Sequence, residues 1–260
     1  MSGIDACTVL TMPVYNEAAG IQEFLAEIAS ALGDHDFRIV VIDDNSTDKT
    51  REVLAELESN SLAGRLWYRS ESVNRGHGPT TVLALQEALN MQTNLVVAVD
   101  GDGQFLGTDL KKLIEIQQSS DSDVCEGVRQ GRREPWFRRI TTMAVRLLVA
   151  VKARSRPPRD ANTPLRVYRS KVLVELLRDL PDDCLVPNLV ISAKCRRRRL
   201  RVTEVPVKSL PRRGGDARVS TMFGIQRLLP TKRFVRFVFK ATVQFLSMKL
   251  ATESRGEGTS

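Results

Sequence analysis

Short apolar runs, polar turns and helical patterns alternate along the first fifty residues, and this alternation restricts the fold more than any other feature. The apolar run at residues 8–12 stops at Pro13, and a helical pattern follows with an apolar residue at every third or fourth position. A β-branched run at residues 38–42 then ends in the polar residues 43–48, before another helical pattern. This order predicts an α/β fold. Ligands of such folds bind beyond the carboxyl ends of the strands, where both polar turns lie.

The strongest candidate site is the sequence VVAVDGDGQF at residues 96–105, where an apolar run ends in two carboxylates one residue apart. In an extended segment Asp100 and Asp102 point to the same side, and Gln104 continues that side as a third oxygen donor. Oxygen ligands so placed suit Mg²⁺ or Mn²⁺ that bridges to the phosphates of a substrate. The alternative is an unliganded surface turn, because Asp-Gly pairs are common turn formers.

Other motifs accompany this one along the chain. In order, they are MPVYNE at 12–17, VIDDNSTDKT at 41–50, NRGHGPT at 74–80, DGDGQF at 100–105, ANTPLRVYRSKVL at 161–173, EVPV at 204–207 and GGDARVS at 214–220. With this set the sequence resembles the family-2 glycosyltransferases over residues 7–221, and its later motifs are most similar to the dolichyl- and polyprenyl-phosphate mannosyltransferase branch. The resemblance implies a GT-A fold, in which a mostly parallel central sheet flanked by helices binds a nucleotide-sugar.

The resemblance also implies a donor-nucleotide site. Its residues in this sequence are Pro13, Tyr15, Asn16, Glu17, Asp44, Gly76 and Asp100. A carboxylate such as Asp44 suits the N–H donors of a base in a partly desolvated pocket. His77 departs from the family pattern, which has a small or acidic residue and often a Lys at its place. His77 either binds phosphate or forms a hydrogen bond within its own loop.

The chemistry that the resemblance implies depends on a divalent metal. Mg²⁺ or Mn²⁺ held by Asp100, Asp102 and Gln104 would neutralise the charge that builds on the diphosphate leaving group. A basic side chain shares this task in the family. Arg218 in GGDARVS matches its place, and Arg212 and Arg213 are nearby alternatives. The implied catalytic residues are Asp102, Asp160 and Arg218.

Two kinds of acceptor remain open. A sugar hydroxyl needs a general base, for which Asp160 is the first candidate. A polyprenyl monophosphate is already ionised and needs cations instead, and Arg129 and Arg139 are the best matches to the acceptor-phosphate arginines of the resembling branch. With such an acceptor, Asp160 would orient Arg166 or bind the sugar. The plainer reading of these arginines is a solvated helix face.

The charge of the chain points to an anionic partner. The formal net charge is +8 and the isoelectric point is about 9.6. The run KCRRRRLR at residues 194–201 favours nucleic acid, but it contains no aromatic residues for base stacking, and we expect no nucleic-acid partner. Anionic lipid headgroups account for the same charge, and an exposed helix end accounts for the run itself.

The end of the chain has a different pattern. We expect residues 1–217 to form the catalytic domain and residues 218–260 to form an amphipathic helical segment with a disordered polar tail. The predicted helix at 232–250 would lie on an anionic membrane surface, on its own catalytic domain, or on a membrane partner subunit. With no apolar window of about twenty residues, no secretory signal and scattered cysteines, we expect a cytoplasmic protein attached peripherally to the cytoplasmic face of a membrane.

These observations predict a metal-dependent inverting transferase that moves a hexose, mannose from GDP-mannose, to a polyprenyl or dolichyl phosphate. One alternative keeps the fold but uses a UDP-sugar of the glucose or GlcNAc type, or a soluble glycan or small-molecule hydroxyl as acceptor. Another is a nucleotide- or nucleic-acid-binding protein without transfer activity. Intact Glu17, Asp44, Asp100 and Asp102 argue against the last of these.

Overall fold

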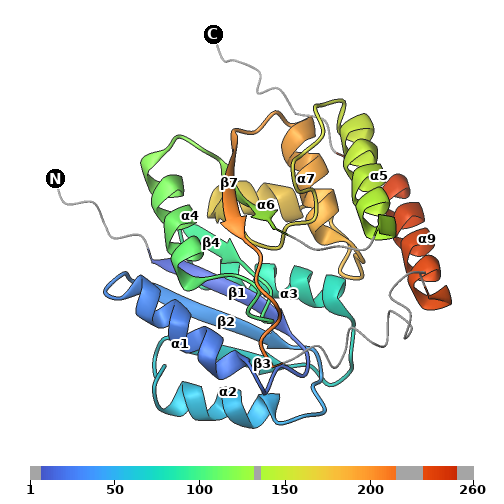
Figure 1. Cartoon of the computed structure of the whole chain (residues 1–260). Helices are drawn as coiled ribbons and strands as arrows, with labels where there is room; N and C mark the ends of the chain where they lie inside the picture. The colour runs from blue at the N-terminus through green and yellow to red at the C-terminus, as the bar shows by residue number, and fades with distance from the viewer. Residues whose placement is uncertain (1–6, 132–135, 215–230, 251–260) are drawn as a thin grey trace.

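A seven-stranded sheet forms the centre of the molecule, as seen in the computed structural model, which describes residues 7–131, 136–214 and 231–250 (Figure 1). The strand order is β3-β2-β1-β4-β6-β5-β7, and only β6 is antiparallel to its neighbours β4 and β5. The mostly parallel α/β sheet predicted from the sequence is thus confirmed. The strands are β1 (Thr8–Val14), β2 (Phe37–Asp43), β3 (Leu66–Ser70), β4 (Leu95–Ala98), β5 (Val124–Gln130), β6 (Arg166–Arg169) and β7 (Val202–Lys208).

Helices cover both faces of the sheet (Figure 1). On one face lie α1 (Ile21–Leu32), α2 (Thr50–Ser59) and α4 (Gly107–Ser119), and on the other lie α3 (His77–Asn90), α6 (Ser170–Leu177) and α7 (Pro187–Arg197). Successive side chains of β1 point to opposite faces of the sheet. Leu10 packs in the core under α1, α2 and α4, and Val9 packs in the core under α3, α6 and α7. Burial on both faces explains why these strands read as continuous apolar runs.

Two further helices lie side by side at one end of the molecule, α5 (Trp136–Ala153) and α9 (Lys232–Ser247) (Figure 1). The C-terminal half of α9 packs on the rest of the fold, because Phe245 is buried in a cluster with Val82 of α3 and Val149 of α5. The amide N–H of Leu185 donates to Gln244 Oε1 at 2.8 Å. The helix predicted for the end of the chain therefore contacts the α/β fold that precedes it. Across the described residues, no helix has the length and hydropathy needed to cross a bilayer.

Candidate functional site

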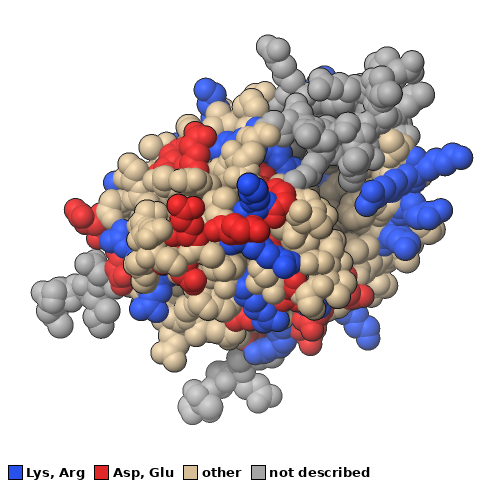
Figure 2. All heavy atoms as spheres, turned by 90° about the horizontal axis from the view of Figure 1, so that it is seen from below, with Lys and Arg blue, Asp and Glu red and all other residues tan. Residues whose placement is uncertain are grey.

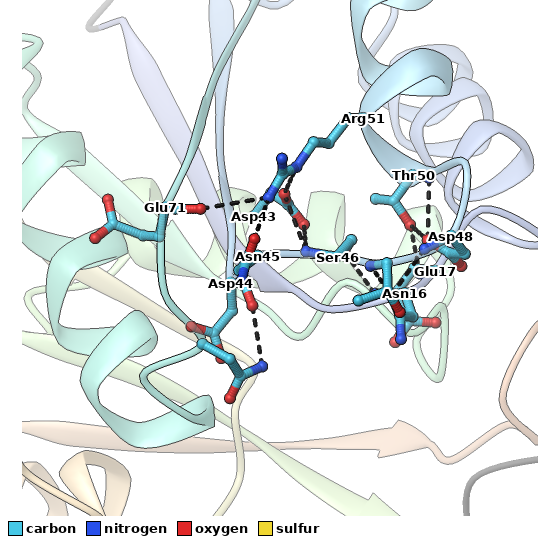
Figure 3. Close-up of polar contacts among 12 residues, drawn as sticks. Asn16, Glu17, Asp43, Asp44, Asn45, Ser46, Asp48, Thr50, Arg51 and Glu71 are labelled. Atoms are coloured by element: carbon cyan, nitrogen blue, oxygen red, sulfur yellow. Dashed lines mark hydrogen bonds and ion pairs between the residues drawn. The ribbon is translucent and has the colours of Figure 1, made fainter.

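Hydrogen bonds join the polar turns that follow β1 and β2 (Figure 3). The parallel register places Val14 opposite Asp43, so both turns leave the sheet at the same edge. Asn16, which has a φ of 53°, donates its backbone N–H to Ser46 Oγ at 2.7 Å and accepts from the Thr47 N–H at 2.6 Å. Asparagine tolerates this left-handed conformation better than most residues. The role of Asn16 in this structure is to join the two turns.

The two aspartates at the end of β2 make different contacts. Asp43 is buried and pairs with the guanidinium of Arg51, with Nε and Oδ2 2.9 Å apart. The carboxylate of Asp44 accepts from the backbone N–H groups of Arg75 and Gly76 at 2.7 and 2.9 Å. Asp44 thereby holds the glycine-containing loop before α3 against the end of β2. The family resemblance singled out Asp44 as a nucleotide-binding carboxylate, but it did not predict the ion pair of Asp43 with Arg51.

A cleft of about 440 Å³ opens at this edge of the sheet, beyond the ends of β1, β2 and β4. The position is the one expected for a ligand of an open α/β sheet. Its lining residues are Pro13, Val14, Tyr15, Glu17, Asp44, Asn74, Gly76, His77, Thr80, Asp100, Gly101, Asp102, Arg212 and Arg233. Of the side chains predicted to bind nucleotide or metal, Asn16 and Gln104 are not among the lining residues.

The carboxylate pair after β4, Asp100 and Asp102, lines this cleft. Gln104 contributes its backbone N–H, which donates to Asp102 Oδ1 at 3.1 Å, and His77 Nε2 lies 3.6 Å from Asp100 Oδ1. Burial, reinforced by the charge of Asp100, raises the pKa of Asp102 to about 7. Two close carboxylates that repel each other fit a divalent cation, which relieves that repulsion.

The protein alone does not complete a coordination shell at this pair. Within the described residues, no group of three or more His, Cys, Asp or Glu side chains is arranged to hold a metal ion. Two carboxylates with open positions suit Mg²⁺ or Mn²⁺, because these ions commonly complete their shell with phosphate oxygens and water. The residues present therefore fit a metal that is bound together with a diphosphate.

Basic side chains approach the cleft from the C-terminal part of the chain. Arg212 forms an ion pair with Glu17, and Arg233 of α9 lines the cleft. Arg218, which the resemblance implied as the catalytic cation, lies outside the described residues. The sequence did not identify Arg233 as a cleft residue, because its pattern placed this arginine in a basic stripe of the predicted helix at 232–250, which was expected to meet lipid phosphates.

A second, largely apolar groove of about 320 Å³ lies between α5 and α9. Arg129 and Asp160 are among its lining residues. They form a bidentate ion pair, in which Arg129 Nε lies 2.7 Å from Asp160 Oδ2 and Nη2 lies 2.9 Å from Oδ1. The charge of Arg129 also lowers the pKa of Asp102, although burial outweighs this effect. Arg129 lines the groove, whereas Arg139 is exposed and is not among the groove-lining residues.

Asp160 does not orient Arg166, which corrects one sequence expectation. Arg166 is fully buried and pairs with Glu126 at 3.2 Å, while its guanidinium donates to the carbonyl oxygen of Ala161 at 3.1 Å. Arg196, from the KCRRRRLR run, reaches the same Glu126 at 2.8 Å. At least this arginine of the run belongs to a buried ion-pair network instead of a free basic surface.

The fold and the cleft together define a class of protein. A mostly parallel α/β sheet with a polar cleft and a carboxylate pair at the strand ends is the architecture of the GT-A glycosyltransferases. Residues 10–176 match glycosyl transferase family 2, and the chain belongs to this family.

Two relatives carry the same description, undecaprenyl-phosphate 4-deoxy-4-formamido-L-arabinose transferase. The protein from Edwardsiella ictaluri (strain 93-146) is 28% identical over 225 residues, which are 85% of this chain and 64% of the relative. The protein from Sodalis glossinidius (strain morsitans) is 26% identical over 218 residues, 82% of this chain and 63% of the relative. The chain thus spans somewhat less than two thirds of the length of these relatives.

Solved structures share the fold at low sequence identity. Glucosyl-3-phosphoglycerate synthase from Mycobacterium tuberculosis, in complex with Mn²⁺ and UDP-glucose, superposes with a TM-score of 0.60 at 17% identity, over 94% of this chain and 80% of that chain. S. aureus TarS residues 1–349, in complex with UDP, gives 0.54 at 21% identity, over 77% and 60%. These likenesses establish the GT-A fold.

Proposed function

We propose that the protein transfers a sugar from a nucleotide-diphosphate donor to the phosphate of a polyprenyl lipid, with inversion at the anomeric carbon. The observation that carries the proposal is the largely apolar groove between α5 and α9, whose lining includes Arg129 and Asp160. An apolar groove suits the first isoprene units, and an arginine in its wall suits a phosphate. The relatives' description as undecaprenyl-phosphate transferases supports the same class of acceptor.

The donor occupies the cleft at the strand ends in this proposal. Asp100 and Asp102 hold Mg²⁺ or Mn²⁺, which supplies Lewis-acid stabilisation of the diphosphate leaving group. Arg212 and Arg233 add positive charge on the other side of the cleft. Tyr15 and Asp44 line the part of the cleft where we place the nucleoside, and Gln104 supports Asp102 through its backbone.

The acceptor needs no general base, because a phosphate monoester is already ionised near neutral pH. Asp160 then holds the guanidinium of Arg129 by its bidentate pair, which fixes the orientation of this arginine in the wall of the groove. Arg139, on the exposed side of α5, attracts the acceptor at longer range. A hydroxyl acceptor would instead require Asp160 to be released from Arg129 before it accepted a proton.

The donor sugar is proposed from motif resemblance alone. The C-terminal motifs favour mannose from GDP-mannose. The alternative is a UDP-linked sugar. The relatives' name specifies a modified arabinose, which is a reason to test sugars other than mannose. Both donors present the same diphosphate to the metal site, so the cleft geometry serves either.

We propose that α5 and α9 attach the protein peripherally to the cytoplasmic face of an anionic membrane. Nine of the twelve large apolar side chains exposed in the described structure lie on these two helices. Neither helix contains an Asp or Glu, and basic side chains project from the edge of the molecule on this side (Figure 2). Apolar and basic residues without acidic ones suit anionic headgroups. A membrane partner subunit that covers the same surface is the alternative.

The test is a transfer assay with purified protein, Mn²⁺ and radiolabelled GDP- and UDP-sugars, with polyprenyl phosphate as acceptor and extraction into organic solvent. Label from one donor in the organic phase would support the proposal and identify the sugar. Donor consumption with only water-soluble product would retain the glycosyltransferase but reject the lipid acceptor.

A further inference from the structure

Residues 210–214, which we call the strap, follow β7 and run directly alongside the carboxylate turn after β4. The Leu210 N–H donates to the carbonyl oxygen of Gln104 at 3.0 Å, and the Arg213 N–H donates to the carbonyl oxygen of Asp102 at 3.0 Å. The strap and the turn are more than 100 residues apart in sequence, yet they are joined by backbone hydrogen bonds on either side of Gly103. The backbone of Asp102 is therefore held from outside its own loop.

The side chain of Arg213 strengthens this attachment. Its guanidinium pairs with Glu23 at 2.9 Å and with Glu27, both on α1, and it lies over the ring of Phe24 at 5.5 Å. Its Nε also lies 3.4 Å from the carbonyl oxygen of Gly103. Only 13% of the side chain is exposed. The arginine is thus a partly buried bracket, by which we mean a side chain that connects α1 to the carboxylate turn.

The fit around this bracket is tight. Gly103 has a φ of +68°, and a Cβ there would lie 2.5 Å from Arg213 Cδ. A Cβ at Gly20, at the start of α1, would lie 2.6 Å from Arg213 Cβ. Such distances are below van der Waals contact, so both positions require glycine when Arg213 is in place. The backbone at Gly20 and Gly103 therefore packs directly against Arg213.

The network extends to the next helix. Glu27, which pairs with Arg213 through Oε2, accepts from the Gly107 N–H at 2.7 Å through Oε1. Gly107 is the first residue of α4, which follows the carboxylate turn. The turn is therefore held at its start by β4 and at its end by Glu27, with Arg213 between these points.

We propose that Arg213 is a positioning residue that holds Asp102 in the geometry required for a divalent metal bound with a nucleoside diphosphate. Asp100 and Asp102 repel each other, and a free turn would relax by moving them apart before metal binds. The bracket prevents this movement, so that metal binding does not first require the turn to reorganise. This inference rests on the proposed metal-nucleotide function of the cleft.

The test compares Arg213→Gln, Arg213→Lys and Glu27→Gln with the matched control Arg201→Gln. Arg201 also pairs with two aspartates, Asp121 and Asp123. It lies just before β7, at the opposite end of this strand from residues 210–214. The measurements are Mn²⁺ affinity by electron paramagnetic resonance with GDP or UDP present, and the thermal midpoint without metal.

We expect Arg213→Gln to weaken Mn²⁺ binding by about 10–100-fold, the range for residues that support metal ligands, while Arg201→Gln stays within about twofold of wild type. Glu27→Gln, which keeps the arginine, should give a smaller loss in the same direction. Arg213→Lys should recover part of the affinity, because it keeps the charge but loses the planar fork.

Wild-type Mn²⁺ affinity in Glu27→Gln and Arg213→Gln would overturn the inference and leave the proposed function intact. If Arg213→Gln does not fold, the Glu27→Gln and Arg213→Lys variants decide the matter by the same readout. An absence of Mn²⁺–nucleotide binding in the wild-type protein would instead reject the proposed function, and this inference with it.

Discussion

Under the proposed function, the cleft at the strand ends and the helix pair α5 and α9 bind two different kinds of partner. Around the cleft, Glu17, Asp43 and Asp44 are buried, and each has a specific hydrogen-bonding or ionic partner. On the helix pair, large apolar side chains are exposed and acidic residues are absent from both helices. The difference fits the proposed ligands, because a small charged donor requires a fixed polar site, whereas a lipid requires an apolar surface with little geometric detail.

The largest expected effect lies at the centre of the polar frame. Asp102→Asn should lower Mn²⁺-dependent transfer on the order of 10³-fold, because the variant removes one of two charged metal ligands. Single-turnover transfer and Mn²⁺ titration measure this. Binding to anionic vesicles should be unchanged, which separates the cleft from the helix pair. Full activity in this variant would contradict the proposal that Asp102 binds a catalytic metal.

Substitution of Arg129 tests whether the groove between α5 and α9 binds the acceptor phosphate. Arg129→Gln should lower kcat/KM for polyprenyl phosphate by about 10–100-fold, the usual range for loss of a charge-assisted hydrogen bond. Steady-state assays over acceptor concentration measure the loss, and Mn²⁺–nucleotide affinity should change little. Arg139→Gln is the matched control, and its effect should be only a few-fold because this side chain is exposed. Equal losses in both variants would place the acceptor phosphate outside the groove.

Membrane attachment should depend on the exposed side of α9. Val235 and Phe239 are 54% and 69% exposed. Glutamate at both positions should weaken binding to anionic vesicles by about tenfold or more, since each side chain loses its apolar burial in the lipid. Val174→Glu, at a 49% exposed position on α6, is the control. Vesicle sedimentation measures the difference, and unchanged binding would assign this surface to a partner subunit.

Metal binding in the cleft should depend on pH, whereas vesicle binding by α5 and α9 should not. Because the pKa of Asp102 is raised to about 7, protons compete with metal in the neutral range. Mn²⁺ affinity should be about tenfold lower at pH 6 than at pH 8. Titration of Mn²⁺ with nucleotide at each pH measures this. Vesicle binding, which depends on Arg and Lys, should stay nearly constant over the same range.

The smallest expected effect concerns stability without metal. A carboxyl group whose folded pKa is raised from 3.8 to about 7 binds protons more tightly in the folded state, so stability falls as pH rises between these values. Asp102→Asn removes this slope and should raise the metal-free thermal midpoint at pH 8 by about 2–4 °C. Calorimetry in EDTA tests this, and a lowered midpoint would contradict a repulsive carboxylate pair.

Much of the fold followed from the sequence because it depends on local patterns. The apolar period of α1 predicted the face formed by Ile21, Leu25, Ile28 and Leu32, and all four residues are buried. The pattern of α9 was read as one apolar face and one basic stripe. Val235, Phe239 and Val243 form a further apolar stripe on this helix, and its exposure became visible only when the neighbouring elements were in place.

The sequence by itself determined the α/β class, the alternation of strands and helices, and the carboxylate pair at a strand end, since these features depend on neighbours within a few positions. Only the tertiary structure decided that Arg129 pairs with Asp160, that Arg233 lines the cleft, and that Arg213 holds the Asp102 turn. Each of these contacts joins residues about 30 to 200 positions apart. Their pairing depends on how strands order in the sheet and which helices meet, and no local period encodes that choice.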